Sequence, residues 1–297
     1  PQAIVIPHEG AAMAMAHGYY LATGRSQAVM AHTNVGLANC AIGAINAAVE
    51  HIPVLLFSGR TPTTERDRFG ARTVPIGWGQ EMRDQTALVR EAVKWDYELR
   101  FPEQVAEVVD RAWAIANSAP RGPVYVNLDS AVQEARISAL PPMPEVSRYR
   151  APEPAQPARE LVAVAAKILS AAKNPLVLAG RSSRSLDAWN ARVALAEKLS
   201  SPVLTNLKVA AAFPTDHRLH VTPPFVRLSP EAQKLVAEAD VILSLDWLDL
   251  GGTLKQAFGD KPVTAKIIQV SCDAHSHRGW SMDYQGLPPV DLYLMCE

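Results

Sequence analysis

Two short segments near the start of the chain hold residues that could do chemistry. Glu9 follows an apolar run, 3–6, and begins a helix-like stretch, 9–22, that is rich in alanine and methionine. Burial among such neighbours would raise the pKa of its carboxyl group, whereas the N-terminus of a helix would favour the charged form. The residue types do not decide between these two effects. An ordinary glutamate in a first helical turn is the alternative interpretation.

The second segment is a polar turn that begins at His32. It follows an apolar run, 27–32, and leads through Thr33 and Asn34 into a helix-like stretch of small residues, 36–51. In open α/β sheets, ligands bind beyond the carboxyl ends of the strands, so His32 is well placed for proton transfer. A histidine that is hydrogen-bonded within the core fits the same position equally well.

The elements that position these residues alternate regularly along the first half of the chain. We predict strands at 3–6, 27–32, 53–59, 93–99 and 123–128, and helices at 9–22, 36–51 and 102–117. Strands that are apolar throughout and separated by helices indicate a parallel sheet covered on both faces. Because the chain opens inside an apolar run without an initiator methionine, we expect a fragment that lacks an upstream strand and helix.

A proline-rich stretch separates this half from a second one with the same rhythm. We expect a first domain at 1–135, a linker at 136–157 and a second domain at 158–297. In the second domain we predict helices at 161–171, 185–199 and 231–239, and strands at 175–180, 202–205, 240–245 and 265–270. The fold class is therefore α/β, with two three-layer domains that are each built on a parallel sheet.

Composition excludes several classes of protein. The 297 residues are 48% hydrophobic and carry a formal net charge of -1, so binding of nucleic acid or a membrane surface through bulk positive charge is not expected. No run approaches the roughly 20 apolar residues of a membrane span. Three cysteines cannot form a disulfide scaffold, so we expect a reducing, cytoplasmic setting.

Common nucleotide and metal motifs are absent or weak. Neither G-x-G-x-x-G nor G-x-x-x-x-G-K-[ST] occurs, which argues against a nicotinamide- or flavin-binding protein. The Ser- and Arg-rich turn 180–184 could bind phosphate at a helix N-terminus, although a solvated polar turn is the simpler interpretation. Cys272, His275 and His277 supply fewer than the four ligands of a structural zinc, so we expect no metal site in this chain.

Taken together, the motifs resemble one family. They are PHEGAA at 7–12, HGY at 17–19, ATGR at 22–25, NVGLAN at 34–39, PVL at 53–55, SG at 58–59, QE at 80–81, VKWDYE at 93–98 and RGPVY at 121–125. This set resembles the pyrimidine-binding domain of thiamine-diphosphate enzymes, the group that includes acetolactate synthase, benzoylformate decarboxylase and pyruvate oxidase. The half after the linker is similar to the central domain of that family, which is Rossmann-like.

The resemblance implies thiamine diphosphate as the cofactor and assigns roles to residues. Glu9 would hydrogen-bond the aminopyrimidine ring nitrogen, and His32 would relay a proton or orient the substrate carboxylate. The implied pyrimidine pocket consists of Glu9, His32, Val35, Gly36 and Asn39, and the implied substrate-side residues are Asn34 and Gln80. A raised pKa of Glu9 would suit this role, and a Cβ at position 36 would press on the ring.

The implied reaction acts on a small-molecule 2-oxo acid. It is a decarboxylation or an acetolactate-synthase-like carboligation, through a cofactor ylide and an enamine. His32 and the run 94–98 are most similar to benzoylformate decarboxylase. Asn34-Val35-Gly36 stands where most relatives carry Gly-Pro-Gly, so the turn departs from the family pattern.

The motif by which the family binds Mg²⁺ and the diphosphate, Gly-Asp-Gly followed by Asn, is missing. Gly259-Asp260-Lys261 does not replace it. In the family, the cofactor lies between the pyrimidine domain of one subunit and the diphosphate domain of another. The resemblance therefore implies a homo-oligomer, dimer or tetramer, or a separate chain that carries the missing domain and its Mg²⁺. We expect the chain to be inactive alone, and we do not expect FAD.

Two alternatives remain open at this point. The chain could be a non-catalytic homologue or an assembly fragment, with the small-residue helix 36–51 as a subunit contact. It could also be similar to a 2-hydroxyacyl-CoA lyase. The intact Glu9 favours an enzyme, and the missing diphosphate motif favours the assembly interpretation.

Overall fold

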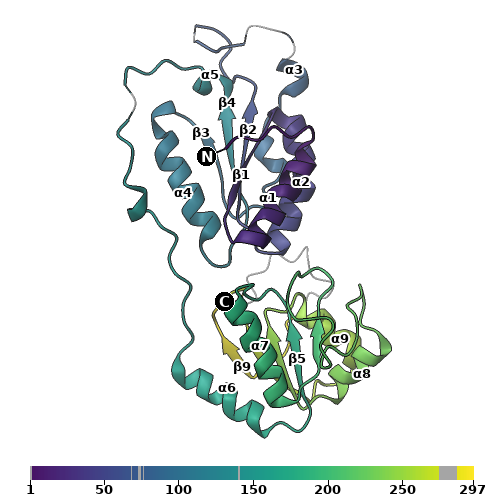
Figure 1. Ribbon diagram of the computed structural model, residues 1–297. Helices are drawn as coiled ribbons and strands as arrows, with labels where there is room; N and C mark the ends of the chain where they lie inside the picture. The colour runs from purple at the N-terminus through teal and green to yellow at the C-terminus, as the bar shows by residue number, and fades with distance from the viewer. Residues whose placement is uncertain (1, 68, 73–74, 76, 140, 274–285) are drawn as a thin grey trace. The chain divides into compact units, whose positions relative to one another are not determined.

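The computed structural model describes residues 2–67, 69–72, 75, 77–139, 141–273 and 286–297 (Figure 1). Contacts divide the chain into two compact units, Pro1–Glu153 and Pro154–Glu297. The division falls inside the proline-rich stretch 136–157.

The first unit is built on a parallel sheet with the strand order β1-β2-β4-β3. Its strands are β1 (Gln27–Ala31), β2 (Val54–Arg60), β3 (Asp96–Leu99) and β4 (Val124–Asp129). Side chains alternate between the two faces along a strand. Val54 and Leu56 therefore enter one apolar core, whereas Leu55 enters the other. The central strands β2 and β4 are buried on both faces, which explains why they are largely apolar. The edge strands differ, because Met30 of β1 is exposed and β3 is mostly half-buried.

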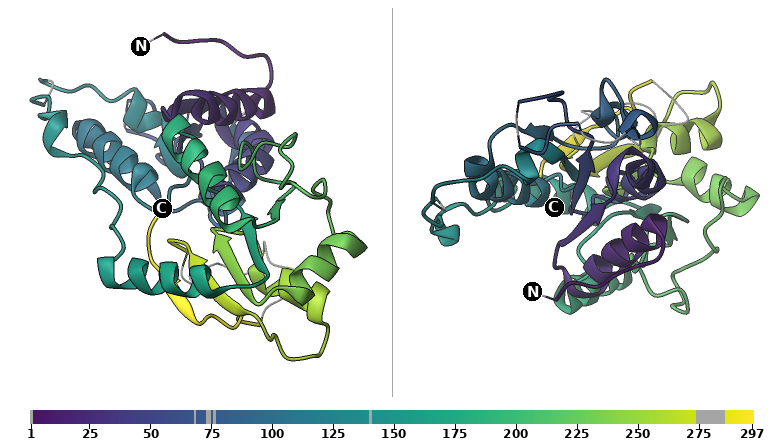
Figure 2. Two further views of the ribbon diagram at one scale, coloured as in Figure 1. Left: turned by 60° about the horizontal axis from the view of Figure 1, so that its bottom comes forward. Right: turned by 90° about the horizontal axis from the view of Figure 1, so that it is seen from above.

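Helices α1 (Glu9–Thr23) and α2 (Thr33–Val49) cover one face of this sheet, and α4 (Val105–Asn117) covers the other. The first two lie side by side (Figures 1 and 2). Their approach is close because a Cβ added to Gly43 of α2 would lie 2.4 Å from the Cβ of Met13 in α1. The short helical turns are α3 (Gly77–Gln80), α5 (Ser130–Gln133), η1 (Gln85–Leu88), η2 (Pro102–Gln104) and η3 (Val146–Arg148).

The second unit is also built on a parallel sheet, in the order β6-β5-β7-β8-β9. The strands are β5 (Pro175–Ala179), β6 (Val203–Thr205), β7 (Val241–Leu245), β8 (Lys266–Val270) and β9 (Leu292–Leu294). One core contains residues of α6 (Arg159–Ala171) and α7 (Leu186–Leu199), and the other contains residues of α8 (Pro230–Glu238) and α9 (Leu250–Phe258). The order of the strands reverses between β5 and β7, which makes this pair the topological switch point.

The α/β class with two parallel three-layer units is confirmed. The predicted strand at 3–6 is wrong, because this run is irregular and Val5 is 96% exposed. No strand in the described part of the chain pairs with it, and an apolar run forms a strand only where a neighbour accepts its hydrogen bonds. The elements that were not predicted include α9, whose second and third residues are glycines, and the three-residue β9. None of the described helices is long and apolar enough to cross a membrane.

Candidate functional site

Glu9 is the first residue of α1, and its carboxylate is held by an amide from α2. Asn39 Nδ2 donates a hydrogen bond to Glu9 Oε2 over 3.0 Å. This bond is the largest influence on the carboxyl group and lowers the pKa of Glu9, and the backbone N–H of Glu9 acts in the same direction. Partial burial opposes them and is the weaker effect. The helix start and Asn39 thus favour the charged form, so the raised pKa that would suit the implied role is not found in this chain.

Gly36 leaves room for that carboxylate. A Cβ added there would lie 3.0 Å from Glu9 Oε1 and 3.2 Å from the Cβ of Ala31 at the end of β1. Both approaches are tighter than ordinary van der Waals contact. A Cβ at position 36 would therefore crowd the Glu9 carboxylate within this chain, as well as the packing of α2 against β1.

The turn between β1 and α2 carries strain and unpaired polar atoms. Thr33 has φ of 50°, a left-handed conformation that a β-branched residue rarely adopts. Within the part of the chain that the structure describes, the buried Thr33 hydroxyl and the buried Asn34 Oδ1 have no hydrogen-bond partner. Strained backbone and orphaned polar atoms persist mainly where a site needs them. The turn at the carboxyl end of β1 is therefore a candidate for a functional role.

The structure brings some of the proposed site residues together and leaves others apart. His32 is exposed at the N-terminus of α2 and lies near enough to lower the pKa of Glu9. Val35 is 59% exposed on the first turn of α2. Gln80 ends α3 and is half-buried, and none of the hydrogen bonds found among the described residues joins it to Glu9.

A buried polar network in the same unit escaped the sequence analysis. Gln85 is 1% exposed, and its Nε2 donates to Ser58 Oγ at 2.9 Å, to the Gly59 carbonyl at 2.8 Å and to Tyr125 and Asn127 at 3.2 Å each. Burial raises the pKa of the Tyr125 hydroxyl. The network ties η1 to β2 and β4. In the sequence, it is indicated by the polar residues that interrupt these two apolar strands.

Next to this network, Arg60 anchors the segment that follows Gln80. Its Nη1 pairs with Glu98 at 3.0 Å, and its Nη2 donates to the carbonyl of Met82 at 3.1 Å. Asn127 joins the same carboxylate of Glu98 through its Nδ2, over 3.2 Å. Arg60 thus fixes Met82, two residues beyond Gln80, against the end of the sheet.

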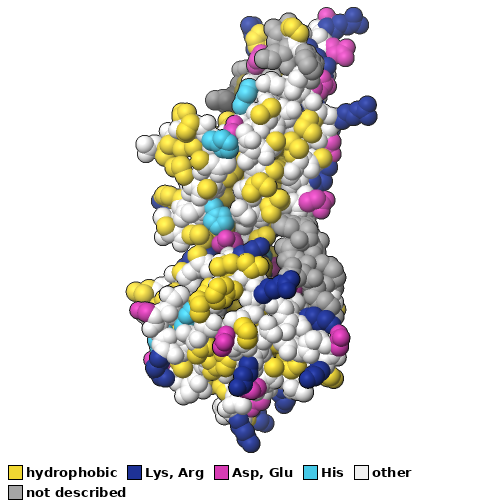
Figure 3. Space-filling view, turned by 90° about the vertical axis from the view of Figure 1, so that its right-hand side faces the viewer, with side chains coloured by type: hydrophobic (Ala, Val, Ile, Leu, Met, Phe, Trp, Pro, Cys, Tyr) yellow, Lys and Arg dark blue, Asp and Glu magenta, His cyan; other side chains and the backbone are white. Residues whose placement is uncertain are grey.

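The outer faces of α1 and α2 are exposed and nearly free of charge. Apart from Glu9, the two helices contain no Lys, Arg, Asp or Glu. Met15 and Tyr19 of α1 are 52% and 44% exposed, and Ile42 and Ile45 of α2 are 68% and 37% exposed. Hydrophobic side chains gather on the side of the first unit shown in Figure 3. An exposed surface that is rich in apolar side chains and nearly free of charge is typical of an interaction site.

In the second unit, the turn 180–184 does not offer a free arginine at its start. Arg181 is buried and pairs with Asp246 over 2.9 Å and with Asp273, and Ser271 donates to the same Asp246. Burial alone would lower the pKa of Arg181, but the two carboxylates raise it above its ordinary value. An added Cβ at Gly180 would lie 2.1 Å from the Asp246 carbonyl oxygen. The chain's own groups therefore fill the switch point between β5 and β7, so Arg181 is committed to this cluster.

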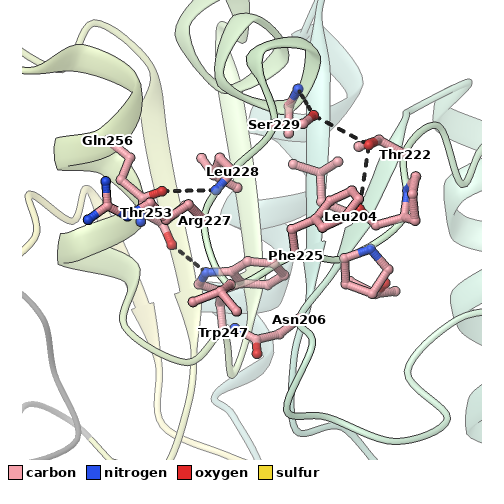
Figure 4. Close-up of a pocket in the computed structure, with 15 residues that line it drawn as sticks. Leu204, Asn206, Thr222, Phe225, Arg227, Leu228, Ser229, Trp247, Thr253 and Gln256 are labelled. Carbon is pink, nitrogen blue, oxygen red and sulfur yellow. Dashed lines mark hydrogen bonds between the residues drawn. The ribbon is translucent and has the colours of Figure 1, made fainter.

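A pocket lies beside that cluster, at the ends of β6 and β7 (Figure 4). The Trp247 indole donates to Thr253 Oγ1 at 2.7 Å, and Gln256 Oε1 accepts from the Leu228 amide at 2.9 Å. Phe225 lies on the loop over the pocket and is 62% exposed. The polar groups named here are thus already paired within the protein.

The metal expectation is tested only in part. His275 and His277 lie outside the described residues. Among the residues that are described, no group of three or more His, Cys, Asp or Glu side chains could hold a metal ion.

Two family models match the chain. Residues 1–88 match the model of the thiamine pyrophosphate enzyme N-terminal TPP binding domain, and residues 162–281 match that of the thiamine pyrophosphate enzyme central domain. The chain belongs to the thiamine pyrophosphate enzyme family. The first match contains Glu9, the turn at His32 and Asn39, so the site described above lies in the part of the family that is named for binding the cofactor.

Curated relatives in this family include two sulfoacetaldehyde acetyltransferases. The protein from Castellaniella defragrans is 32% identical over 273 residues, which cover 91% of this chain and 43% of that protein. The protein from Rhodobacter capsulatus is 35% identical over 238 residues, covering 80% and 38%. A probable acetolactate synthase large subunit from Methanocaldococcus jannaschii is 27% identical, with coverage of 82% and 40%. The chain thus spans 38–43% of the length of these relatives.

Solved structures show the same fold. A putative thiamin diphosphate-dependent enzyme from Mycobacterium smegmatis aligns with a TM-score of 0.71 at 23% identity, over 98% of this chain and 52% of that chain. Benzoylformate decarboxylase from Polynucleobacter necessarius aligns with a TM-score of 0.69 at 25% identity, over 90% and 48%.

Proposed function

We propose that this chain supplies the pyrimidine-activating part of a thiamine-diphosphate-dependent enzyme that breaks or forms a carbon–carbon bond of a 2-oxo acid. The observation that carries the proposal is the Glu9 carboxylate, held by Asn39 at the start of α1 within the matched N-terminal TPP binding domain. Relatives named for acetyl transfer, acetolactate synthesis and 2-ketoarginine decarboxylation support this class of reaction.

The described residues fit the aminopyrimidine part of the cofactor. Glu9 Oε1, which is not the oxygen that Asn39 holds, lies beside Gly36 and can accept a hydrogen bond from a protonated ring nitrogen. His32 is exposed at the same edge and can hold or move a proton on the substrate side. When bound, thiamine diphosphate supplies the electron sink for cleavage next to a carbonyl.

In this proposal, a domain outside this sequence supplies the rest of the site. The family's motif for Mg²⁺ and the diphosphate does not occur in the sequence, so a diphosphate-binding domain, in a second subunit or a separate chain, completes the site. The exposed, uncharged face of α1 and α2 is where we place that domain. We therefore expect a homo-oligomer or a two-chain complex, and little cofactor binding or turnover by this chain alone.

The decisive experiment compares two glutamates in the native protein that contains this chain. Glu9→Gln keeps the size of the side chain but removes its charge, whereas Glu107→Gln makes the same change on the exposed face of α4. Exchange of the cofactor C2 proton is followed by NMR with thiamine diphosphate and Mg²⁺ present. We expect the rate to fall at least about a hundredfold in Glu9→Gln, the range of general acid–base catalysis, and to stay unchanged in Glu107→Gln. Equal rates in both variants would rule out the role given to Glu9.

The partner surface has its own test. Ile42→Glu places a charge on the exposed face of α2, and Leu186→Glu places one on α7, where the side chain is similarly exposed at 72% against 68%. Analytical ultracentrifugation of the native protein should show dissociation for the first variant only. Intact assembly of Ile42→Glu would place the partner on another surface.

A second candidate activity is transfer of an acetyl group involving sulfoacetaldehyde. Five relatives at 31–35% identity carry that name, and two of these are the sulfoacetaldehyde acetyltransferases described above. The test is to incubate the native protein and cofactor with sulfoacetaldehyde, and separately with a panel of 2-oxo acids, and to follow loss of each compound. If sulfoacetaldehyde is consumed and none of the 2-oxo acids is, the result would select this candidate over the 2-oxo acid proposal.

A further inference from the structure

The residue before Glu9 holds the first turn of α1 in an unusual way. His8 has extended backbone angles, φ −147° and ψ 130°, and its side chain caps the helix. The Nδ1 atom of the imidazole accepts a hydrogen bond from the Gly10 amide at 3.0 Å. The His8 carbonyl accepts from the amides of Ala11 and Ala12 at 3.0 and 3.2 Å. His8 thus satisfies three amides of the first turn, a task more often given to Ser, Thr, Asp or Asn.

Gly10 is shaped to receive this imidazole. A Cβ added to Gly10 would lie 3.2 Å from both Cε1 and Nδ1 of His8, closer than ordinary van der Waals contact. The same Cβ would lie 3.7 Å from the carbonyl oxygen of Asn39. The ring, the glycine and the residue that binds the Glu9 carboxylate therefore lie next to one another.

Glu9 stands between these two contacts. Its backbone lies between His8 and Gly10, which the imidazole joins, and its carboxylate reaches Asn39 on the neighbouring helix. The direction in which its side chain leaves α1 depends on the backbone angles of this first turn. A loose first turn would let the carboxylate adopt other rotamers and leave Asn39.

We propose that His8 is a positioning residue for Glu9, because its imidazole caps α1 and so directs the Glu9 carboxylate onto Asn39. The importance of this contact for catalysis rests on the function proposed above for Glu9. The structural claim stands independently of it and is measured on this chain without cofactor.

The test uses three variants and one matched control. His8→Ala removes the acceptor, His8→Asn replaces it with a favourable capping side chain, and Gly10→Ala pushes the imidazole away from the amide. The control, Ser185→Ala, removes the cap of α7, where Ser185 Oγ accepts from the Ala188 amide at 3.2 Å. It therefore removes a cap in the other unit and leaves the first turn of α1 unchanged.

The readouts at pH 7.5 are solvent exchange of the Gly10 amide and the side-chain amide resonances of Asn39, with Glu9→Ala as the reference for a lost hydrogen bond to Asn39. In His8→Ala and Gly10→Ala, we expect Gly10 to exchange about tenfold faster, the order of effect of one lost cap. The Asn39 resonances should move toward those of Glu9→Ala. His8→Asn should restore both readouts, and Ser185→Ala should change neither.

Two results would overturn the proposal. One is an unchanged Asn39 side-chain resonance in His8→Ala, which would show that the cap does not direct the carboxylate. The other is failure of His8→Asn to restore it, which would show that capping is not the reason for the effect. Neither depends on turnover. A fully active Glu9→Gln enzyme would refute the function proposed for Glu9. It would leave these measurements, and the assignment of His8, unaffected.

Discussion

Replacing Gly36 with alanine tests whether the chain itself is built around the Glu9 carboxylate. The new Cβ would lie 3.0 Å from Glu9 Oε1 and 3.2 Å from the Cβ of Ala31. Ala31 is buried at the end of β1, so its position is fixed by the sheet, whereas the carboxylate is the free end of a flexible side chain. We expect the carboxylate to move away and to lose the hydrogen bond from Asn39.

Two other helical glycines provide the scale for this change. Alanine stabilises a helix over glycine by about 1 kcal/mol. Gly18 of α1 has open space around its Cβ position, so Gly18→Ala should gain about that amount. At Gly43 the Cβ would lie 2.4 Å from the Cβ of Met13, and overpacking of this kind costs about 1–3 kcal/mol. Gly36→Ala should fall between them, within about 1 kcal/mol of the parent chain, because the propensity gain offsets the tight approach to Ala31.

The assay combines urea unfolding with NMR titration of the Glu9 carboxyl group. The hydrogen bond from Asn39 is the main reason that the pKa of Glu9 is lowered, so its loss in Gly36→Ala should raise this pKa toward the ordinary value of a glutamate. Gly18→Ala should leave it unchanged. An unshifted pKa in Gly36→Ala would refute the idea that the glycine makes room for the carboxylate, and an equal shift in Gly18→Ala would show a general effect of the helix.

Three further outcomes follow from buried groups. The left-handed conformation of Thr33 costs about 1–2 kcal/mol, and Thr33→Gly relieves it. In urea unfolding, the free energy of unfolding of Thr33→Gly should therefore stay within about 1 kcal/mol of the parent. The control Thr205→Gly, in β6, should lose about 2 kcal/mol. Gln85→Leu leaves several buried partners unpaired and should cost about 3 kcal/mol in the same assay. Burial, with a smaller effect of the Glu9 charge, raises the pKa of the Cys40 thiol to about 12. As the pH rises, the thiol therefore loses its proton in the unfolded chain before it does so in the folded chain. The stability that the neutral thiol contributes is complete below about pH 8.5 and is lost as the pH rises toward the folded value, and Cys40→Ala should flatten that alkaline decline between pH 7 and pH 10.

Sequence patterns were sufficient for the architecture because burial on both faces of a parallel sheet leaves a plain apolar signal. Runs such as 53–59 and 175–180 correspond closely to β2 and β5. The run 3–6 carries the same signal but has no neighbouring strand in the described chain, and hydrophobicity alone does not report pairing. The helix α9 shows the opposite failure, since a Gly-Gly pair near its start hides a helix whose N-terminus is capped by Asp249.

The polar contacts of the site lay beyond sequence reasoning because their partners are far apart in the chain. Asn39 is thirty positions from Glu9, and Gln85 gathers groups from two strands of the sheet. Local patterns report helical turns and strand alternation, whereas such contacts depend on how the elements stack. The resemblance placed Asn39 in the pyrimidine pocket, yet its hydrogen bond to Glu9 emerged only from the packing of α2 on α1.

The lowered pKa of Glu9 bears on the catalytic role proposed for this residue. Desolvation is what raises the pKa of a carboxyl group, and in this chain it is weaker than the hydrogen bond from Asn39. The Ala- and Met-rich helix therefore does not supply a dry surrounding, because Met13 and Ala16 enter the core whereas Met15 and Tyr19 are exposed. Water can be removed from Glu9 only by something that covers the exposed edge of α1 and α2. A higher pKa of Glu9 in the assembly proposed above than in this chain would then measure the contribution of that covering surface.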